Sequence, residues 1–174
     1  METTEYLAFI PLLIYGIALA DLLGEWKRLF QPEGWYLPYL LMTLILTESA
    51  VYNVFIYASL ILQMQGQDYL TYLTFLVPPI LFLMSVNSFT PDAGDDTKTY
   101  FISKMRIFFL LIAVFSASHF FYSFGESQTM EIAGRSVAII LSLIGGIFRK
   151  PWVVYVLFVF WLLLFAEKAS LIAT

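Results

Sequence analysis

The chain of 174 residues contains no cysteine and a single histidine, His119. The lack of cysteine excludes disulfides, thiolate nucleophiles, iron–sulfur clusters and cysteine-based zinc sites. One imidazole is too few for a bis-histidine haem or for a zinc site that needs two histidines. The sequence has no glycine-rich phosphate-binding motif of the Walker or Rossmann type. We therefore predict no cofactor, no metal and no catalytic residues.

Charge is also scarce. Asp, Glu, Lys and Arg make up 13% of the chain, against about 25% in soluble domains. Hydrophobic residues make up 60%, and the mean hydropathy of +0.82 excludes a disordered chain. Nine basic residues stand against thirteen acidic ones, for a net charge of -4, without a basic block that would suit nucleic acid. The composition predicts a polytopic integral membrane protein.

The apolar segments predict an all-α transmembrane helix bundle that forms one domain over residues 1–174. A membrane-spanning helix needs about 20 apolar residues. By that measure the spans are approximately 6–23, 36–62, 69–89, 101–124, 130–148 and 152–166. The fifth span is short, because the thirteen residues between Arg135 and Arg149 cover about 20 Å of helix. The alternative is an interfacial helix and a protein with five spans.

The basic residues predict the orientation, because cytoplasmic loops carry an excess of Lys and Arg. With six spans, seven basic residues fall on one side and two on the other: Lys27, Arg28, Lys98, Lys104, Arg106, Arg149 and Lys150 against Arg135 and Lys168. We expect both termini outside the cell and a location in the plasma (cytoplasmic) membrane. No basic residue precedes Lys27, so we interpret the first span as an uncleaved helix.

Two ladders of small residues at intervals of four predict close helix contacts, because small side chains let backbones approach one another in lipid. The fifth span carries Gly134, Ala138, Ser142 and Gly146, and the first span carries Gly16, Ala20 and Gly24. The longer ladder is the more specific signal. Its interface lies either inside the subunit or between subunits, so we expect a homo-oligomer or a partner membrane subunit in addition to the lipid bilayer.

Polar residues inside the spans are candidates for an ion or ligand pathway, because a charge at the bilayer centre costs at least ~2.5 kcal/mol. Glu48 lies near the middle of the second span, Pro78 is expected to kink the third, and His119 lies toward the outer end of the fourth. We expect the pathway to include Glu48, Asn53, Tyr57, Pro78, Ser116 and His119. The structural alternatives are a protonated Glu48 that joins two helices and an interfacial His119.

At the inner side, Asp21 with Lys104 or Arg106 is a candidate ion pair between the first and fourth spans. Such a pair can close an inner gate or serve as a static link between helices. The sequence favours a small transporter or channel that moves protons, cations or a small solute with the help of the Glu48 carboxyl. The alternative is a non-enzymatic subunit, sensor or assembly partner of a larger membrane complex. An intramembrane enzyme ranks third, because no nucleophile with a nearby base is evident.

Overall fold

A computed structural model describes residues 3–31, 35–60, 68–121 and 129–172, and within these ranges the chain is helical, with no strands. Six α-helices and two short 3₁₀ helices follow one another: α1 (Thr3–Glu25), η1 (Trp26–Phe30), α2 (Leu37–Leu60), α3 (Tyr69–Phe89), α4 (Thr97–Ser118), η4 (His119–Phe121), α5 (Thr129–Phe148) and α6 (Trp152–Ile172). The predicted all-α fold and its six helical segments are confirmed. The predicted span ends at 61–62 and 122–124 lie outside the described residues.

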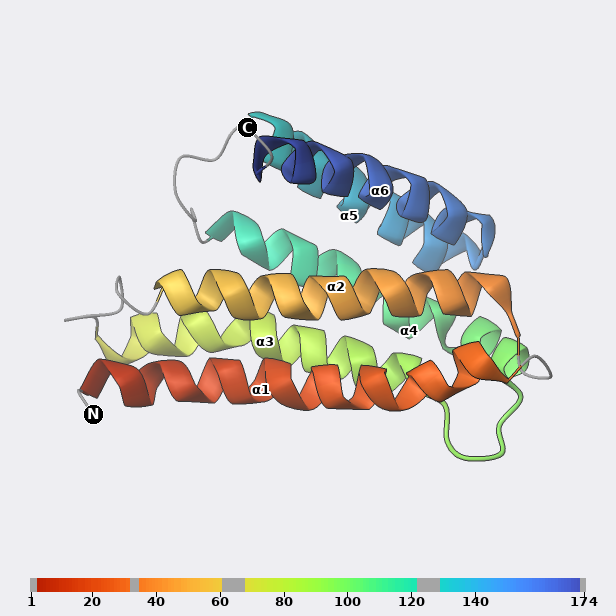
Figure 1. The fold of residues 1–174 in the computed structure, drawn as a ribbon, viewed down its shortest axis with the longest axis horizontal. Helices are drawn as coiled ribbons and strands as arrows, with labels where there is room; N and C mark the ends of the chain where they lie inside the picture. The colour runs from red at the N-terminus through yellow and green to blue at the C-terminus, as the bar shows by residue number, and fades with distance from the viewer. Residues whose placement is uncertain (1–2, 32–34, 61–67, 122–128, 173–174) are drawn as a thin grey trace.

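The helices run back and forth along the long axis of the molecule, and both ends of the chain lie at the same end of the bundle (Figure 1). The α5–α6 pair is inclined to α1, α2 and α3. Each helix packs against two neighbours, in the order α1, α2, α6, α5, α4, α3 and back to α1, and α2 also touches α4. The six helices therefore form a ring, and its interior is available to side chains from all of them.

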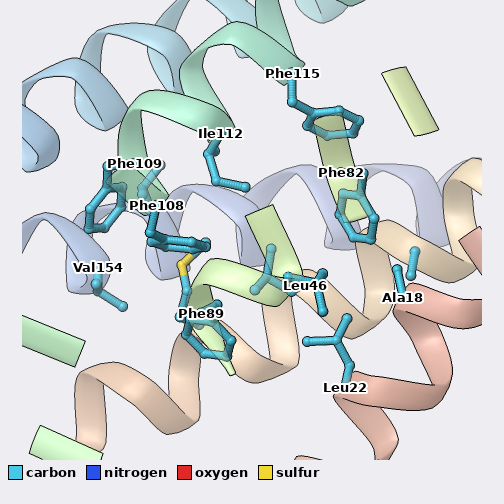
Figure 2. Close-up of a cluster of buried hydrophobic side chains, with 14 of the residues drawn as sticks. Ala18, Leu22, Leu46, Phe82, Phe89, Phe108, Phe109, Ile112, Phe115 and Val154 are labelled. Atoms are coloured by element: carbon cyan, nitrogen blue, oxygen red, sulfur yellow. The ribbon is translucent and has the colours of Figure 1, made fainter. Parts of the chain in front are cut away.

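Aromatic side chains fill much of this interior. Figure 2 shows Phe82 and Phe89 with Phe108, Phe109 and Phe115, all buried where α3 and α4 face the other helices. The rings contact one another closely, with centroids 5.1 Å apart for both Phe82–Phe115 and Phe89–Phe108. Offset and edge-on contacts of this kind add about 0.5–1.5 kcal/mol per pair to the burial of the rings.

Short-range signals set where several helices begin and end. The Asp68 carboxylate accepts a hydrogen bond from the backbone N–H of Thr71 (2.7 Å), and that of Asp96 accepts one from Thr99 (2.8 Å). These side chains cap the first turns of α3 and α4. The helix α5 ends differently, because Arg149 follows it with a φ of 50°, in the left-handed region that favours glycine.

Four helices are long and apolar enough to cross a membrane, over Phe9–Arg28, Leu37–Tyr57, Tyr69–Phe89 and Thr97–Ser118. The apolar parts described in α5 and α6 are shorter and cover Ile132–Phe148 and Trp152–Ala166. The outward surface of the bundle is rich in large hydrophobic side chains, including Phe55 and Ile140, which are 75% and 57% exposed. Soluble monomers seldom expose contiguous apolar surface on this scale.

Candidate functional site

A buried polar network joins three helices in the half of the bundle nearer the chain ends. The Tyr15 hydroxyl of α1 donates to Asn53 Oδ1 of α2 (3.3 Å), and His119 Nε2 lies 3.1 Å from the same oxygen. The Asn53 amide nitrogen donates to the Ser49 carbonyl (2.7 Å). All three network side chains, Tyr15, Asn53 and His119, are at most 9% exposed. Asn53 and His119 were predicted from the sequence as candidate residues, whereas Tyr15 was not.

The hydrogen-bond acceptors around His119 favour a second proton on its ring. Its Nδ1 lies 2.9 Å from the Phe115 carbonyl, so both ring nitrogens face oxygen acceptors. A neutral imidazole has one N–H and would present a lone pair to one of these oxygens. Turning the Asn53 amide offers its nitrogen to the ring but brings its oxygen against the Ser49 carbonyl. A ring with both nitrogens protonated satisfies all of these contacts.

Other features of the site oppose a positive charge on this ring. His119 is buried, and the guanidinium of Arg135 on α5 donates to the His119 carbonyl (3.4 Å). Burial and a neighbouring cation both disfavour the imidazolium. The hydrogen-bond acceptors therefore favour a second proton on His119, whereas its burial and Arg135 favour the neutral ring.

Tyr57 and the proline pair of α3 form the next part of the site. A proline removes the backbone N–H that would bond the carbonyl four residues earlier, so Pro79 frees the carbonyl of Phe75. The Tyr57 hydroxyl donates to that carbonyl (3.0 Å), and its ring lies 5.3 Å from the ring of Tyr15. Pro78 and Pro79 are buried. The Phe75 carbonyl, whose helical hydrogen bond Pro79 cannot form, thus has a partner from α2.

Glu48 lies at the middle of α2 but faces a different neighbour. Its carboxylate accepts a hydrogen bond from the indole N–H of Trp161 on α6 (2.8 Å), and its side chain is half-buried. Asn53 comes five positions after Glu48, which places the two about 7.5 Å apart along the axis and on different faces of the helix. The structure does not join Glu48 to the Tyr15–Asn53–His119 network. Ser116, also expected in the pathway, is half-buried on α4.

At the opposite end of the bundle, the structure does not bring the residues of the predicted ion pair together. Asp21, Lys104 and Arg106 are all exposed, and the structure does not bring Asp21 together with either cation. Asp21 belongs to α1, which packs against α2 and α3, whereas the two cations lie on α4, whose main neighbours are α3 and α5. The ion pair described at this end joins Glu25 to Arg28.

Glu25 and Arg28 form the centre of a second network. The Glu25 carboxylate also accepts a hydrogen bond from the Tyr39 hydroxyl (2.8 Å), and the ring of Tyr39 stacks on Phe89. Arg28 donates to Thr97 Oγ1 (3.3 Å) and to the carbonyls of Pro91 and Asp92 (3.5 and 3.3 Å). The network connects η1 to α2 and to the α3–α4 connection. The three-residue spacing of Glu25 and Arg28 was the only sequence signal for it.

The two small-residue ladders have different surroundings. On α5, a Cβ added at Gly146 would lie 3.3 Å from the Arg106 carbonyl of α4, and one at Gly134 would lie 3.5 Å from Leu164 of α6. Ser142 is fully buried with a hydroxyl that has no hydrogen-bond partner, and Ala138 is half-buried. Of the two interfaces left open for this ladder, its contacts here are inside the subunit.

The α1 ladder has no such contacts. Gly16, Ala20 and Gly24 are exposed, and a Cβ added at either glycine would meet nothing within 4 Å. This ladder therefore does not pack against any other helix in the described part of the chain.

Within the described ranges, no group of three or more His, Asp or Glu side chains is arranged to hold a metal ion. Comparison of the chain with protein-family models, with curated proteins and with solved structures finds no match. The two networks and Glu48 are therefore the features that indicate what the protein does.

Proposed function

We propose that the chain is an integral membrane protein with six spans and with both termini outside the cell. Four long apolar helices and an outward surface rich in hydrophobic side chains support the membrane location. Chain ends at one end of the bundle suit an even number of crossings. The seven basic residues of the expected inner side favour a cytoplasmic location for the opposite end, in the plasma membrane. In this arrangement α5 spans the bilayer, with Arg135 close to its outer surface.

We further propose that the protein moves protons across this membrane, alone or coupled to a cation or small solute. The observation that carries the proposal is that both ring nitrogens of the buried His119 face oxygen acceptors, while burial and Arg135 disfavour the charge that would satisfy them. Proton uptake gives the second ring nitrogen an N–H to donate to its oxygen acceptor. Proton release removes the positive charge from the buried ring. Neither the neutral ring nor the doubly protonated ring meets both conditions. Such a site is suited to binding a proton and releasing it again.

Glu48 is the second proton-binding group of the proposed mechanism. It is the carboxyl at the middle of α2, the helix that also carries Asn53 of the His119 network. A movement of α2 would change the surroundings of both groups together, and the Trp161 indole would then leave or regain the Glu48 carboxylate. Beside this path, the Tyr57 hydroxyl of the same helix donates to the Phe75 carbonyl of α3.

The test is proton flux into liposomes that contain the purified protein, under an imposed pH gradient. His119→Gln and Glu48→Gln remove the two titratable groups while keeping side chains that can form hydrogen bonds. Asp21→Asn is the matched control, because it removes one exposed carboxylate outside both networks. We expect flux in the wild type and in Asp21→Asn, and loss of flux in the other two variants. Flux that persists in His119→Gln and Glu48→Gln, or is absent from the wild type, contradicts the proposal.

The second candidate function is a non-enzymatic subunit, sensor or assembly partner of a larger membrane complex. The outward ladder of α1 favours it, because Gly16, Ala20 and Gly24 offer a close approach that none of the described helices uses. Gentle solubilisation followed by native mass measurement tests this function. A second copy or a fixed partner that is lost on Ala20→Leu supports it. If the wild type and Ala20→Leu are both monomers without a bound partner, this function is contradicted.

A further inference from the structure

The basic end of the α4–α5 seam carries cations that the protein itself leaves unpaired. Arg106 on α4 and Arg149 and Lys150 after α5 are exposed, and within the described part of the chain none of them has an acidic partner. The nearby Lys104 ammonium lies over its own helix neighbour, the ring of Tyr100, at 5.8 Å. Exposed arginine and lysine without a carboxylate nearby attract anions from the surroundings.

Helix packing brings the backbone positions that carry these cations close together. Gly146 brings α5 so near to α4 that an added Cβ would lie 3.3 Å from the Arg106 carbonyl. Arg149 follows three residues later, so it projects about one helical turn beyond the level of Arg106. The exposed Trp152 opens α6 immediately afterwards. Tryptophan at a helix end is typical of the headgroup level of a bilayer, which places the cations at the depth of lipid phosphates.

The backbone of Arg149 is an independent indication. Its φ of 50° lies in the left-handed region, where glycine is the usual residue after a helix end and where other residues incur strain of about 1–2 kcal/mol. The position thus holds an arginine at the expense of backbone strain. A guanidinium with five donors is well suited to phosphate oxygens, which gives this residue a use that glycine cannot supply.

We propose that Arg106, Arg149 and Lys150 form a binding site for the phosphate headgroup of an anionic phospholipid in the inner leaflet. The proposal goes beyond proton transport and rests only on the proposed membrane placement. The headgroup phosphate lies over the α4–α5 seam, and its acyl chains lie along the exposed apolar side chains Ile107 and Ile147. Lipid-binding sites of this kind join basic residues at the cytoplasmic ends of neighbouring helices.

The test measures lipid retained by the full-length protein in nanodiscs of phosphatidylcholine with increasing phosphatidylglycerol, by native mass spectrometry. The test variant is Arg149→Gly with Lys150→Gln, in which glycine also suits the backbone at position 149. The control is Lys27→Gln with Lys98→Gln, which removes two exposed cations from the same end of the bundle. Since one basic residue near the surface contributes about a fivefold change in binding, we expect the test variant to bind phosphatidylglycerol about 25-fold more weakly.

The outcomes separate a specific site from general attraction. Wild-type retention of phosphatidylglycerol, matched by the control and lost in the test variant, supports the site. Equal weakening in both double variants overturns it, because bulk charge alone would then explain the binding. A third measurement adds inorganic phosphate at millimolar concentration and follows the lipid that the protein retains. If phosphate displaces the lipid completely, free phosphate is the ligand and the lipid proposal fails. Flux measurements play no part, so failure of the transport proposal remains distinguishable.

Discussion

Replacement of Arg28 by glutamine offers the most direct test of how the basic end of the bundle is held together. Arg28 is the cation paired with Glu25, and the two side chains are 13% and 6% exposed. Its guanidinium also reaches Thr97 and two carbonyls of the α3–α4 connection. In Arg28→Gln, the carboxylate of Glu25 stays buried with Tyr39 as its remaining hydrogen-bond donor.

The expected magnitude follows from that uncompensated charge. Removing one member of a buried ion pair costs about 3–5 kcal/mol, because the other charge stays desolvated. The lost contacts to Thr97 and to the carbonyls of Pro91 and Asp92 are long, so they add little. We therefore expect Arg28→Gln to lower the free energy of unfolding by about 3–4 kcal/mol. The double variant Glu25→Gln/Arg28→Gln should be more stable than Arg28→Gln alone, because it contains no buried charge.

The assay is reversible unfolding in mixed micelles as the proportion of denaturing detergent rises, followed by circular dichroism. Lys27→Gln is the control, because it removes an exposed neighbouring cation outside the network. A loss below about 1 kcal/mol in Arg28→Gln would place the pair among surface ion pairs and refute the reasoning. So would a double variant whose loss equals the sum of the two single losses, because contacting charges must be coupled.

Three further outcomes follow from individual contacts, and the same unfolding assay measures them. Tyr57→Phe should cost about 0.5–1.5 kcal/mol by removing the hydrogen bond from its hydroxyl to the Phe75 carbonyl of α3, and adding Pro79→Ala should recover part of that loss because a backbone N–H returns; equal losses with and without Pro79 would contradict the assigned contact. Gly146→Leu should destabilise the bundle by about 1–3 kcal/mol, because its side chain meets the backbone of α4, whereas Gly24→Leu on the open face of α1 should not; similar losses would refute the close approach. Hydrogen bonds from the side chain and backbone of Thr99 hold the pKa of Asp96 below its usual value, so its stabilising effect should be present at neutral pH and be lost as the pH falls through that lowered pKa; Asp96→Asn should flatten this acid dependence, and an unchanged pH profile would contradict the cap.

Much of the fold could be predicted from the sequence, because the positions of helices in apolar segments depend on local composition. The third and sixth predicted spans begin within a residue of α3 and α6. The end of α6 differs most, because the helix continues to Ile172 rather than ending at residue 166. The start of α4 also differs, because the structure begins this helix at Thr97, where Asp96 caps it, rather than at residue 101. The polar residues before the apolar run, including Lys98, belong to the helix although they do not resemble a membrane span.

The candidate site was only partly predictable. Asn53 and His119 could be singled out because each is a polar residue in an apolar stretch. Their contact joins residues 66 positions apart and depends on how α2 and α4 cross, which no local pattern specifies. The partner of Glu48 is Trp161, 113 residues later, for the same reason. Tyr15 was overlooked because a tyrosine within an apolar span is not distinguished from the other aromatic residues of the chain.

The sequence by itself determined the number of helices, their apolar character and the placement of charge near their ends, because each of these depends on residues that are neighbours in the chain. Tertiary structure alone decided the partners: Arg28 for Glu25 in place of the pair expected from Asp21, and α4 and α6 as the neighbours of the α5 ladder. Partner choice depends on helix rotation and on the order of helices around the ring. A difference of one residue in rotation turns a side chain by about 100°, so spacing along the chain leaves the facing helix undetermined.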